Sequence, residues 1–418
     1  MSDLQIIIVA FALLHVCFES CLNLLNLRKL LKSKDLQPEE TKAIMNETQW
    51  RDATDYTIGK TKFSLCQDFF SFVLFIPIII FLFPWVFQNW DVTKAAGIFQ
   101  CAFISVAFLL VVQFPGLIFD WFKQFHLEEK FGFNKSNPKL WVVDKLKENI
   151  LGLILGTLIF GLLIWLFRIL SDLSEYWWFF AFNAFFLFQL VMMVLWPKFI
   201  LPLFNKLSPL EDGSLKERLF DLAKRTGFAA QTIDVIDGSK RSSHSNAFFT
   251  GFGKFRRIVL YDTLINQMEE SQVEAVLAHE IGHYKKGHIP KRLFFSFLTG
   301  LLGFYLLSLG MLQEWLFSGL NLPAQYIGSM SAVLIGAILI IPNFTYWLSP
   351  ISNIFSRKHE YEADRFAKEA MNGGNELVEA LRQLYRENLS HPSPHWLLVF
   401  FHYSHPTFFD RKNALDSL

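Results

Sequence analysis

The sequence is poor in charge, in cysteine and in repeats, and each shortage removes a class of protein. Only 18% of its 418 residues are charged, against about 25% in ordinary soluble domains. The 39 basic and 38 acidic residues give a formal net charge of +1, so no overall field would attract nucleic acid or an acidic partner. The four cysteines include no CxxC pair and lie in or beside apolar stretches, which offers no disulfide framework.

Hydrophobic residues are abundant instead, since they make up 52% of the chain and include 47 Phe and 12 Trp. A helix that crosses the hydrocarbon core of a bilayer needs about 20 mostly apolar residues. Six uncharged windows of roughly that length predict membrane-spanning helices at 69–90, 95–119, 149–167, 176–197, 293–313 and about 327–350. A seventh predicted span, 4–18, is shorter. The alternative of a secretory signal is disfavoured because residues 1–4 include no basic side chain.

Basic residues in the connections predict the orientation of these spans, because short cytosolic loops accumulate Lys and Arg. The connection 28–62 holds eight and the connection 120–148 holds six, whereas the second, fourth and sixth connections hold only Lys94 and Arg168. The N-terminus is therefore predicted to lie outside the cytosol, with the long fifth connection and the C-terminal segment inside it. The predicted parts are five membrane helices in 1–205, an insert in 206–292, two membrane helices in 293–350 and a C-terminal segment in 351–418.

The insert has the pattern of a small α/β unit. Residues 215–225 have helical periodicity between Ser214, a candidate N-cap, and Gly227, a candidate C-terminal glycine. Three strands and a further helix are predicted at 232–236, 246–250, 257–261 and 271–287, with a turn at 251–254 between the second and third strands.

The last of these elements contains an HExxH motif, His279-Glu280-Ile281-Gly282-His283. Imidazoles at positions i and i+4 project from one helix face and can hold one zinc ion at about 2.0–2.1 Å, while Glu280 reaches a water on the metal. Chance would produce three fixed positions in a chain of this length on the order of one time in a hundred. An apolar face beside the motif argues against a surface helix with incidental histidines.

A catalytic zinc site needs a third protein ligand, and the segment 356–364 offers Glu360. Asp364 shares its helix face and can accept a hydrogen bond from the distal nitrogen of a ligand histidine, which we assign to His279. His359 is the alternative ligand, but its neighbouring position turns it about 100° from that face. Glu362 points about 160° away from Glu360 and is expected to be solvated.

HExxH followed by ExxxD resembles the gluzincin metalloproteases, and the wider sequence resembles the membrane-integrated CAAX prenyl proteases of type I, the Ste24 family of peptidase family M48. The shared segments cover nearly the whole chain and are 127–135, 201–206, 240–253, 258–264, 278–283 and 402–406. The resemblance implies a mainly α-helical fold in which seven membrane helices enclose a chamber, with a small cytosolic α/β portion. That portion would bind one Zn²⁺ per chain through His279, His283 and Glu360.

The resemblance also implies roles for four residues outside the zinc ligands. Asn246 and Ala247 resemble a sheet edge that pairs with an extended substrate, His405 resembles a histidine that stabilises an oxyanion, and Arg411 is assigned to substrate binding. The alternatives are a structural turn at His405 and a surface salt bridge at Arg411. Four further histidines belong to no recognisable motif and are expected to be ordinary loop or helix residues: His244, His288, His391 and His395. Two ionisable residues in a membrane span mark a cavity or a partner, or else lie at the membrane interface, and they are His15 and Glu19.

The implied activity is removal of the last three residues of prenylated CAAX proteins, with Glu280 as general base. The expected partners are a lipidated or membrane-associated peptide and membrane lipid, without nucleic acid. One alternative is a quality-control zinc protease without prenyl specificity, and another is a transporter or channel with a vestigial metal site, which the complete ligand set disfavours. The chain ends at Leu418 without a dilysine-like tail, which favours a bacterial member in the cytoplasmic membrane; a eukaryotic member would lie in the endoplasmic reticulum membrane.

Overall fold

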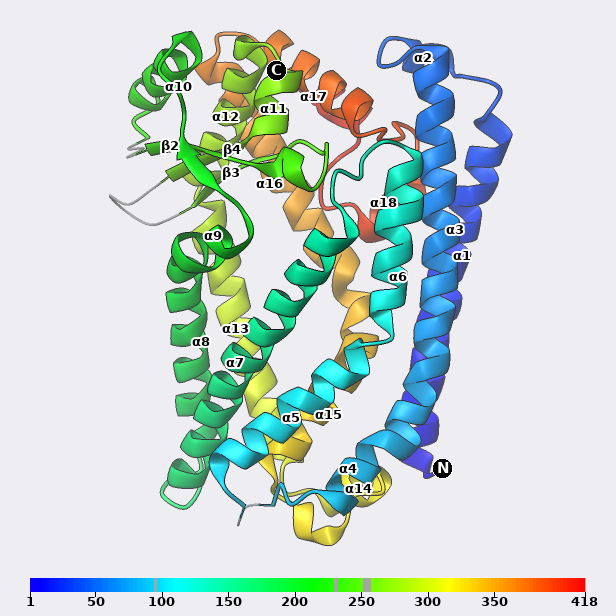
Figure 1. Ribbon diagram of the computed structural model, residues 1–418, viewed down its shortest axis with the longest axis vertical. Helices are drawn as coiled ribbons and strands as arrows, with labels where there is room; N and C mark the ends of the chain where they lie inside the picture. The colour runs from blue at the N-terminus through cyan, green and yellow to red at the C-terminus, as the bar shows by residue number, and fades with distance from the viewer. Residues whose placement is uncertain (94–95, 229–231, 251–256, 418) are drawn as a thin grey trace.

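A computed structural model describes residues 1–93, 96–228, 232–250 and 257–417. The molecule is elongated and mainly helical, with the N-terminus near one end of its long axis and the C-terminus near the other (Figure 1). The predicted turn at 251–254 lies outside the described residues.

Six helical segments are long and apolar enough to cross a membrane, and a bent pair makes a seventh if it is one span. They are α1 (Asp3–Ser33), α3 (Glu47–Pro77) with α4 (Phe83–Asn89), α7 (Pro138–Leu170), α8 (Trp177–Leu195) with α9 (Leu201–Phe204), α13 (His288–Gly310), α15 (Met330–Thr345) with α16 (Ser349–Ala370), and the bent pair α5 (Ile98–Gln113) and α6 (Gly116–Phe122). Each predicted window overlaps one of them, so the prediction of a mainly helical, polytopic membrane protein is confirmed.

The predicted span 95–119 is not one straight helix. The axes of α5 and α6 differ by 45° across the break at Phe114 and Pro115. Proline has no backbone N–H to donate and its ring clashes with the preceding helical turn, so a bend at this position has a local cause.

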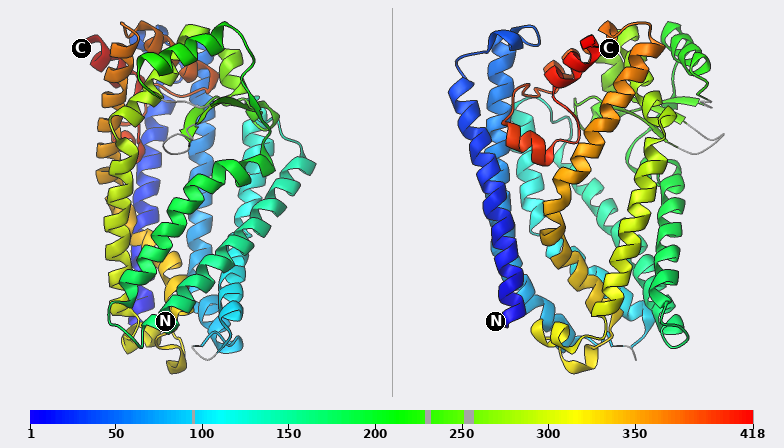
Figure 2. Two further views of the ribbon diagram at one scale, coloured as in Figure 1. Left: turned by 90° about the vertical axis from the view of Figure 1, so that its left-hand side faces the viewer. Right: turned by 180° about the vertical axis from the view of Figure 1, so that it is seen from behind.

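The spans pack most closely at the end of the molecule near the N-terminus. A buried cluster there joins α4, α5, α7 and α15 through side chains such as Phe83, Phe87, Ala102, Leu163 and Ile335. Toward the other end the ribbons of α1 and α3 separate from those of α8 and α13 (Figures 1 and 2). The enclosed chamber itself stays a prediction.

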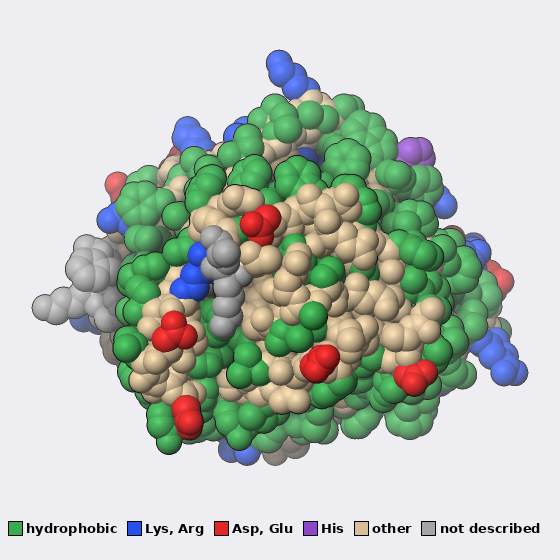
Figure 3. Space-filling view, turned by 90° about the horizontal axis from the view of Figure 1, so that it is seen from below, with side chains coloured by type: hydrophobic (Ala, Val, Ile, Leu, Met, Phe, Trp, Pro, Cys, Tyr) green, Lys and Arg blue, Asp and Glu red, His purple; other side chains and the backbone are tan. Residues whose placement is uncertain are grey.

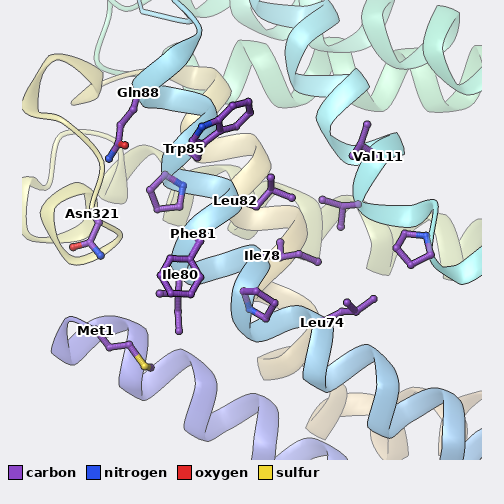
Figure 4. A pocket seen from close by; sticks show the side chains of 14 residues that line it. Met1, Leu74, Ile78, Ile80, Phe81, Leu82, Trp85, Gln88, Val111 and Asn321 are labelled. Carbon is purple, nitrogen blue, oxygen red and sulfur yellow. The ribbon is translucent and has the colours of Figure 1, made fainter.

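A cavity of about 920 Å³ opens beside α3 and α4 at the N-terminal end (Figure 4). None of the 14 side chains that line it is acidic, basic or a histidine, and they include Phe81, Leu82, Trp85 and Val111. Because it has no titratable side chain and lies at the end of the molecule remote from the HExxH helix, this cavity is not a candidate for hydrolytic chemistry.

The insert forms a four-stranded sheet of order β1-β2-β4-β3. Strands β2 (Thr232–Ile236) and β4 (Arg257–Tyr261) pair in parallel, while β1 (Leu207–Pro209) and β3 (Ala247–Thr250) are antiparallel to them. Three strands therefore lie where the sequence predicts them, and β1 is an addition that its three residues were too short to indicate. In this order β3 is an edge strand.

Helices cover this sheet and close the end of the molecule that contains the C-terminus (Figure 1). They are α10 (Ser214–Arg225), α11 (Asp262–Gln267), α12 (Glu270–Lys285), α17 (Asn375–Glu387) and α19 (Phe408–Ser417). Helix α18 (Trp396–His402) instead packs on α16 and α1, and the short helices elsewhere are α2 (Glu39–Lys42) and α14 (Glu314–Gly319). The prediction that Ser214 caps α10 is wrong, because Gly213 is the N-cap and the Ser214 hydroxyl donates to Glu270. Gly227 follows the C-cap with φ of +60°, as the sequence predicts.

Candidate metal centre

Helix α12 positions the HExxH residues by burying its apolar face. Glu269 and Gln272 form a reciprocal capping box at its start, and Gly287, with φ of +67°, separates its end from the next helix, α13. Val273 and Leu277 are about 1% exposed in the core shared by α10, α17 and the sheet. The motif histidines are thereby turned toward α16.

Gly282 allows α12 to lie directly against α16. A Cβ atom at this position would stand 2.9 Å from both the Cα and the carbonyl oxygen of Ala363. Backbone atoms cannot move aside as a flexible side chain can, so only glycine fits without displacing one of the two helices. This close approach brings Glu360 of α16 to the motif histidines.

Replacing Gly282 with alanine is therefore expected to destabilise the protein. Overpacking of this kind costs about 1–3 kcal/mol, and thermal unfolding of the detergent-solubilised protein would measure it. Gly303→Ala in α13 is the matched control, because no atom of the described residues lies within 4 Å of the Cβ it would add. A Gly282→Ala protein as stable as the control would show that the two helices do not depend on this contact.

Three ligand atoms converge between α12 and α16. His279 Nε2 and His283 Nε2 are 3.2 Å apart, and they lie 3.4 Å and 3.3 Å from the Glu360 carboxylate oxygens. Glu360 is 3% exposed, and its Oε2 atom has no hydrogen-bond partner among the described residues. Two imidazoles and a buried carboxylate with an unsatisfied oxygen are a donor set that fits a divalent metal ion. His279, His283 and Glu360 also form a group whose ligand atoms all lie within 4.8 Å of one another.

A second layer of contacts orients His279. Its Nδ1 atom is 2.8 Å from Asp364 Oδ1, which is the partner the sequence predicts, and Asp364 is 1% exposed. Arg411 of α19 donates from Nε to Asp364 at 2.8 Å. Arg411 is only 8% exposed, so the alternative of a surface salt bridge is wrong and its pairing with Asp364 is internal. A substrate contact by Arg411 stays a prediction.

Electrostatics at the motif favour proton binding when no metal is present. Burial and the Arg411 guanidinium act to lower the pKa of His279, but its contacts with the Asp364 and Glu360 carboxylates outweigh them and raise it to about 9. Burial raises the pKa of Glu280 above its usual range, against the lowering effect of the two histidines. A carboxylate with a raised pKa is a stronger base near neutral pH, which suits a group that must both accept and return a proton.

His405 lies at the open side of this group. Its Nε2 atom is 3.4 Å from Glu360 Oε1, and 64% of its side chain is exposed. The Ser404 hydroxyl is 3.0 Å from its Nδ1 atom. The ring therefore stands beside the ligand atoms and remains accessible to a bound molecule.

The predicted substrate edge lies beside the HExxH helix. Ala247 begins β3, which packs against α12, and Asn246 immediately precedes it. The Asn246 carbonyl accepts from Tyr261 N at 3.1 Å, so the ladder with β4 extends one residue beyond the strand. One side of β3 has no neighbouring strand in the described sheet.

The structure overturns the expectations for Glu362 and His288, which lie near the site. Glu362 is not simply solvated, because its Oε2 atom lies 3.0 Å from His288 Nε2 and its side chain is 32% exposed. His288 is 2% exposed and touches His283 as well. The alternative ligand His359 stacks on His288, with ring centroids 4.0 Å apart, and is not part of the converging group. The sequence spacing could not predict the contact between His288 and Glu362, because it depends on the turn of the chain at Gly287.

The remaining singled-out residues have protein partners. Glu19 lies 2.8 Å from His402 Nε2 and accepts from Tyr346, while His15 Nδ1 is 3.2 Å from Asn343. This supports an internal partner over the membrane interface for both residues. The other contacts are those of His244 with Asn388, of His391 with the Trp50 ring and of His395, which caps α18.

An HExxH helix joined by a buried carboxylate from a second helix, in a chain with six or seven membrane spans, defines an integral-membrane metallopeptidase. Two family profiles match the chain: "CAAX prenyl protease N-terminal, five membrane helices" over residues 26–206, and "Peptidase family M48" over residues 209–418. The chain therefore belongs to the CAAX prenyl protease group of peptidase family M48, and it is a metalloprotease that acts on a peptide or protein substrate.

Individual relatives match over almost their entire length. CAAX prenyl protease 1 of Saccharomyces cerevisiae is 35% identical, covering 99% of this chain and 95% of the yeast protein. The Arabidopsis thaliana homologue is 33% identical, covering 98% and 96%. The crystal structure of S. mikatae Ste24p aligns with a TM-score of 0.87 at 34% identity and covers 100% of this chain and 99% of that one. The family resemblance and fold class predicted from the sequence are confirmed, while a bacterial origin stays a prediction.

Proposed function

We propose that the chain binds one Zn²⁺ through His279, His283 and Glu360 and removes the C-terminal tripeptide of prenylated CAAX proteins. The observation that carries the metal assignment is the convergence of the two Nε2 atoms on a buried carboxylate, whose Oε2 atom has no hydrogen-bond partner in the described part of the chain. The substrate assignment is supported by the relatives named CAAX prenyl protease 1. The division into a membrane part (1–205 and 293–350) and a proteolytic part (206–292 and 351–418) belongs to the same proposal.

Each side chain of the site has its own role in the proposed reaction. When bound, the metal acts as a Lewis acid that makes water acidic enough to react near neutral pH. Glu280 takes the proton of the attacking water and returns it to the leaving amine. His405 donates to the oxygen that becomes negative during the attack, and Asp364 with Arg411 holds His279 in place. The free side of β3, beginning at Asn246 and Ala247, pairs with the extended peptide backbone.

The membrane supplies part of the substrate selection in this proposal. A prenylated peptide partitions to the bilayer, and α12 leads through Gly287 directly into the span α13. We place the zinc residues on the cytosolic side because the connections 28–62 and 120–148 are rich in Lys and Arg. Across the middle of the opposite end, Asp and Glu are scattered while most of the visible Lys and Arg lie at the rim (Figure 3), which agrees with this orientation.

Cleavage of a farnesylated peptide and of its unprenylated twin tests the substrate class. We expect the farnesylated peptide to have a kcat/KM at least about tenfold higher, equivalent to 1.4 kcal/mol of lipid binding realised in the transition state. A zinc chelator should abolish cleavage of both peptides, and added zinc should restore it. Equal kcat/KM values for the two peptides would contradict prenyl recognition and favour a general membrane quality-control protease.

A further inference from the structure

The two motif histidines have different supports behind them. His279 meets a carboxylate directly, since its Nδ1 atom lies 2.8 Å from Asp364. The Nδ1 atom of His283 instead lies 2.9 Å from Nδ1 of His288, a third imidazole. The contacts continue outward, because Nε2 of His288 is 3.0 Å from Glu362 Oε2. His283 is therefore connected to a carboxylate through an intermediate ring.

Hydrogen-bond chemistry allows one arrangement of protons along this chain of contacts when His283 binds a metal. The Nε2 atom of His283 must then present its lone pair, so its ring proton sits on Nδ1 and is donated to His288. His288 accepts at Nδ1, which leaves its own proton on Nε2 to be donated to Glu362. An ionised carboxylate only accepts, so every contact has one donor and one acceptor.

The fold holds His288 in place for this contact. It is the first residue of α13, immediately after the left-handed Gly287, and it is 2% exposed. The ring of His359, from α16, stacks on it with centroids 4.0 Å apart and an interplanar angle of 15°. Lys291, one turn further along α13, places its Nζ atom 3.9 Å from Glu362. Residues of α13 and α16 thus orient the imidazole behind His283.

We propose that His288, oriented by Glu362, is a positioning residue that fixes the tautomer and ring orientation of His283 toward the metal. The inference rests on the proposed zinc site and assigns a function to a histidine outside the HExxH and Glu360 set. Partners behind a metal ligand typically contribute about 10–100-fold in metal affinity or activity. We expect an effect of that size on zinc affinity when the hydrogen bond at His288 is removed.

Two substitutions separate hydrogen bonding from packing. His288→Gln keeps an acceptor oxygen for His283 and a donor amide for Glu362 but loses the ring that stacks on His359. His288→Phe keeps a ring of similar size but has no polar atom. Zinc affinity of the full-length, detergent-solubilised protein, measured by chelator competition, should fall about 10–100-fold for His288→Phe and by clearly less for His288→Gln. If His288 acts only by packing, the order of the two variants is reversed, which would overturn the inference.

Two controls complete the experiment. His391→Phe replaces another buried histidine, 7% exposed and packed on Trp50, and should leave zinc affinity unchanged. Glu362→Ala should weaken zinc binding in the same direction as His288→Phe, and the double variant should be less affected than the product of the two. If the unmodified protein binds no zinc, the proposed function fails. If it binds zinc and His288→Phe matches it, only the present inference fails.

Discussion

Glu280→Gln should reduce peptide cleavage by about 10²–10⁴-fold while leaving the metal bound. The substitution keeps the size of the side chain but removes the base, and general acid–base catalysis contributes a factor of this range. Glu280 is outside the group of converging ligand atoms, so zinc content should stay that of the unmodified protein. Single-turnover cleavage of a prenylated peptide, together with metal analysis of the same sample, would measure both quantities.

The matched control for this variant is Glu369→Gln. Glu369 is an exposed carboxylate of α16, nine residues beyond Glu360, and no contact among the described residues connects its side chain to the site. It should cleave at the rate of the unmodified enzyme. Near-normal hydrolysis by Glu280→Gln would remove Glu280 from the mechanism, and loss of zinc from that variant would show that Glu280 affects metal binding.

The Glu360→Ala protein should lose its zinc as well as its peptide-cleaving activity. Groups that merely orient a ligand contribute about 10–100-fold in metal affinity, so removing the third direct ligand should cost at least about 100-fold. Turnover at ordinary zinc concentrations should disappear with the metal. Chelator competition would give the affinity, and peptide cleavage across a range of zinc concentrations would show whether excess metal restores activity.

The same variant should also lower the stability of the metal-free protein. Without metal, the buried Glu360 carboxylate lies 3.4 Å and 3.3 Å from the Nε2 atoms of His279 and His283, and it helps to raise the pKa of His279 to about 9. Removing it leaves a buried imidazolium without one of its partners. With a chelator present, Glu360→Ala should therefore unfold at a lower temperature than the unmodified protein. Zinc at 100 times its Kd should stabilise the unmodified protein by about 2.7 kcal/mol. An equal zinc-induced shift in the variant would contradict the assignment of Glu360.

The membrane helices and the HExxH helix were predictable because local sequence determines them. About 20 apolar residues suffice to indicate a span, and α12 was indicated by its periodic apolar face, with Gly287 close to its end. Glu360 and Asp364 could be paired from their spacing alone, since residues four apart share a helix face. The contact of Asp364 with His279 then followed from the chemistry of a ligand histidine.

The residues behind these ligands could not be predicted, because their contacts depend on how separate helices pack. The sequence gives no distance between His288 and Glu362, which are 74 positions apart and meet only after Gly287 turns the chain. The burial of Arg411 against Asp364 likewise requires α19 to fold back onto α16. Strand β1 is too short for an alternation of apolar and polar residues to be recognised, and it forms by pairing with the edge of β2.

The central claim is that one zinc ion is bound jointly by residues of α12 and α16. X-ray absorption at the zinc edge, with metal analysis of the purified full-length protein, tests it most directly. We expect about one zinc per chain with two imidazole nitrogens near 2.0–2.1 Å and a carboxylate oxygen in the first shell, and the oxygen contribution should be lost in Glu360→Ala. A protein that binds no zinc, or one whose zinc environment is unchanged by Glu360→Ala, would contradict the account.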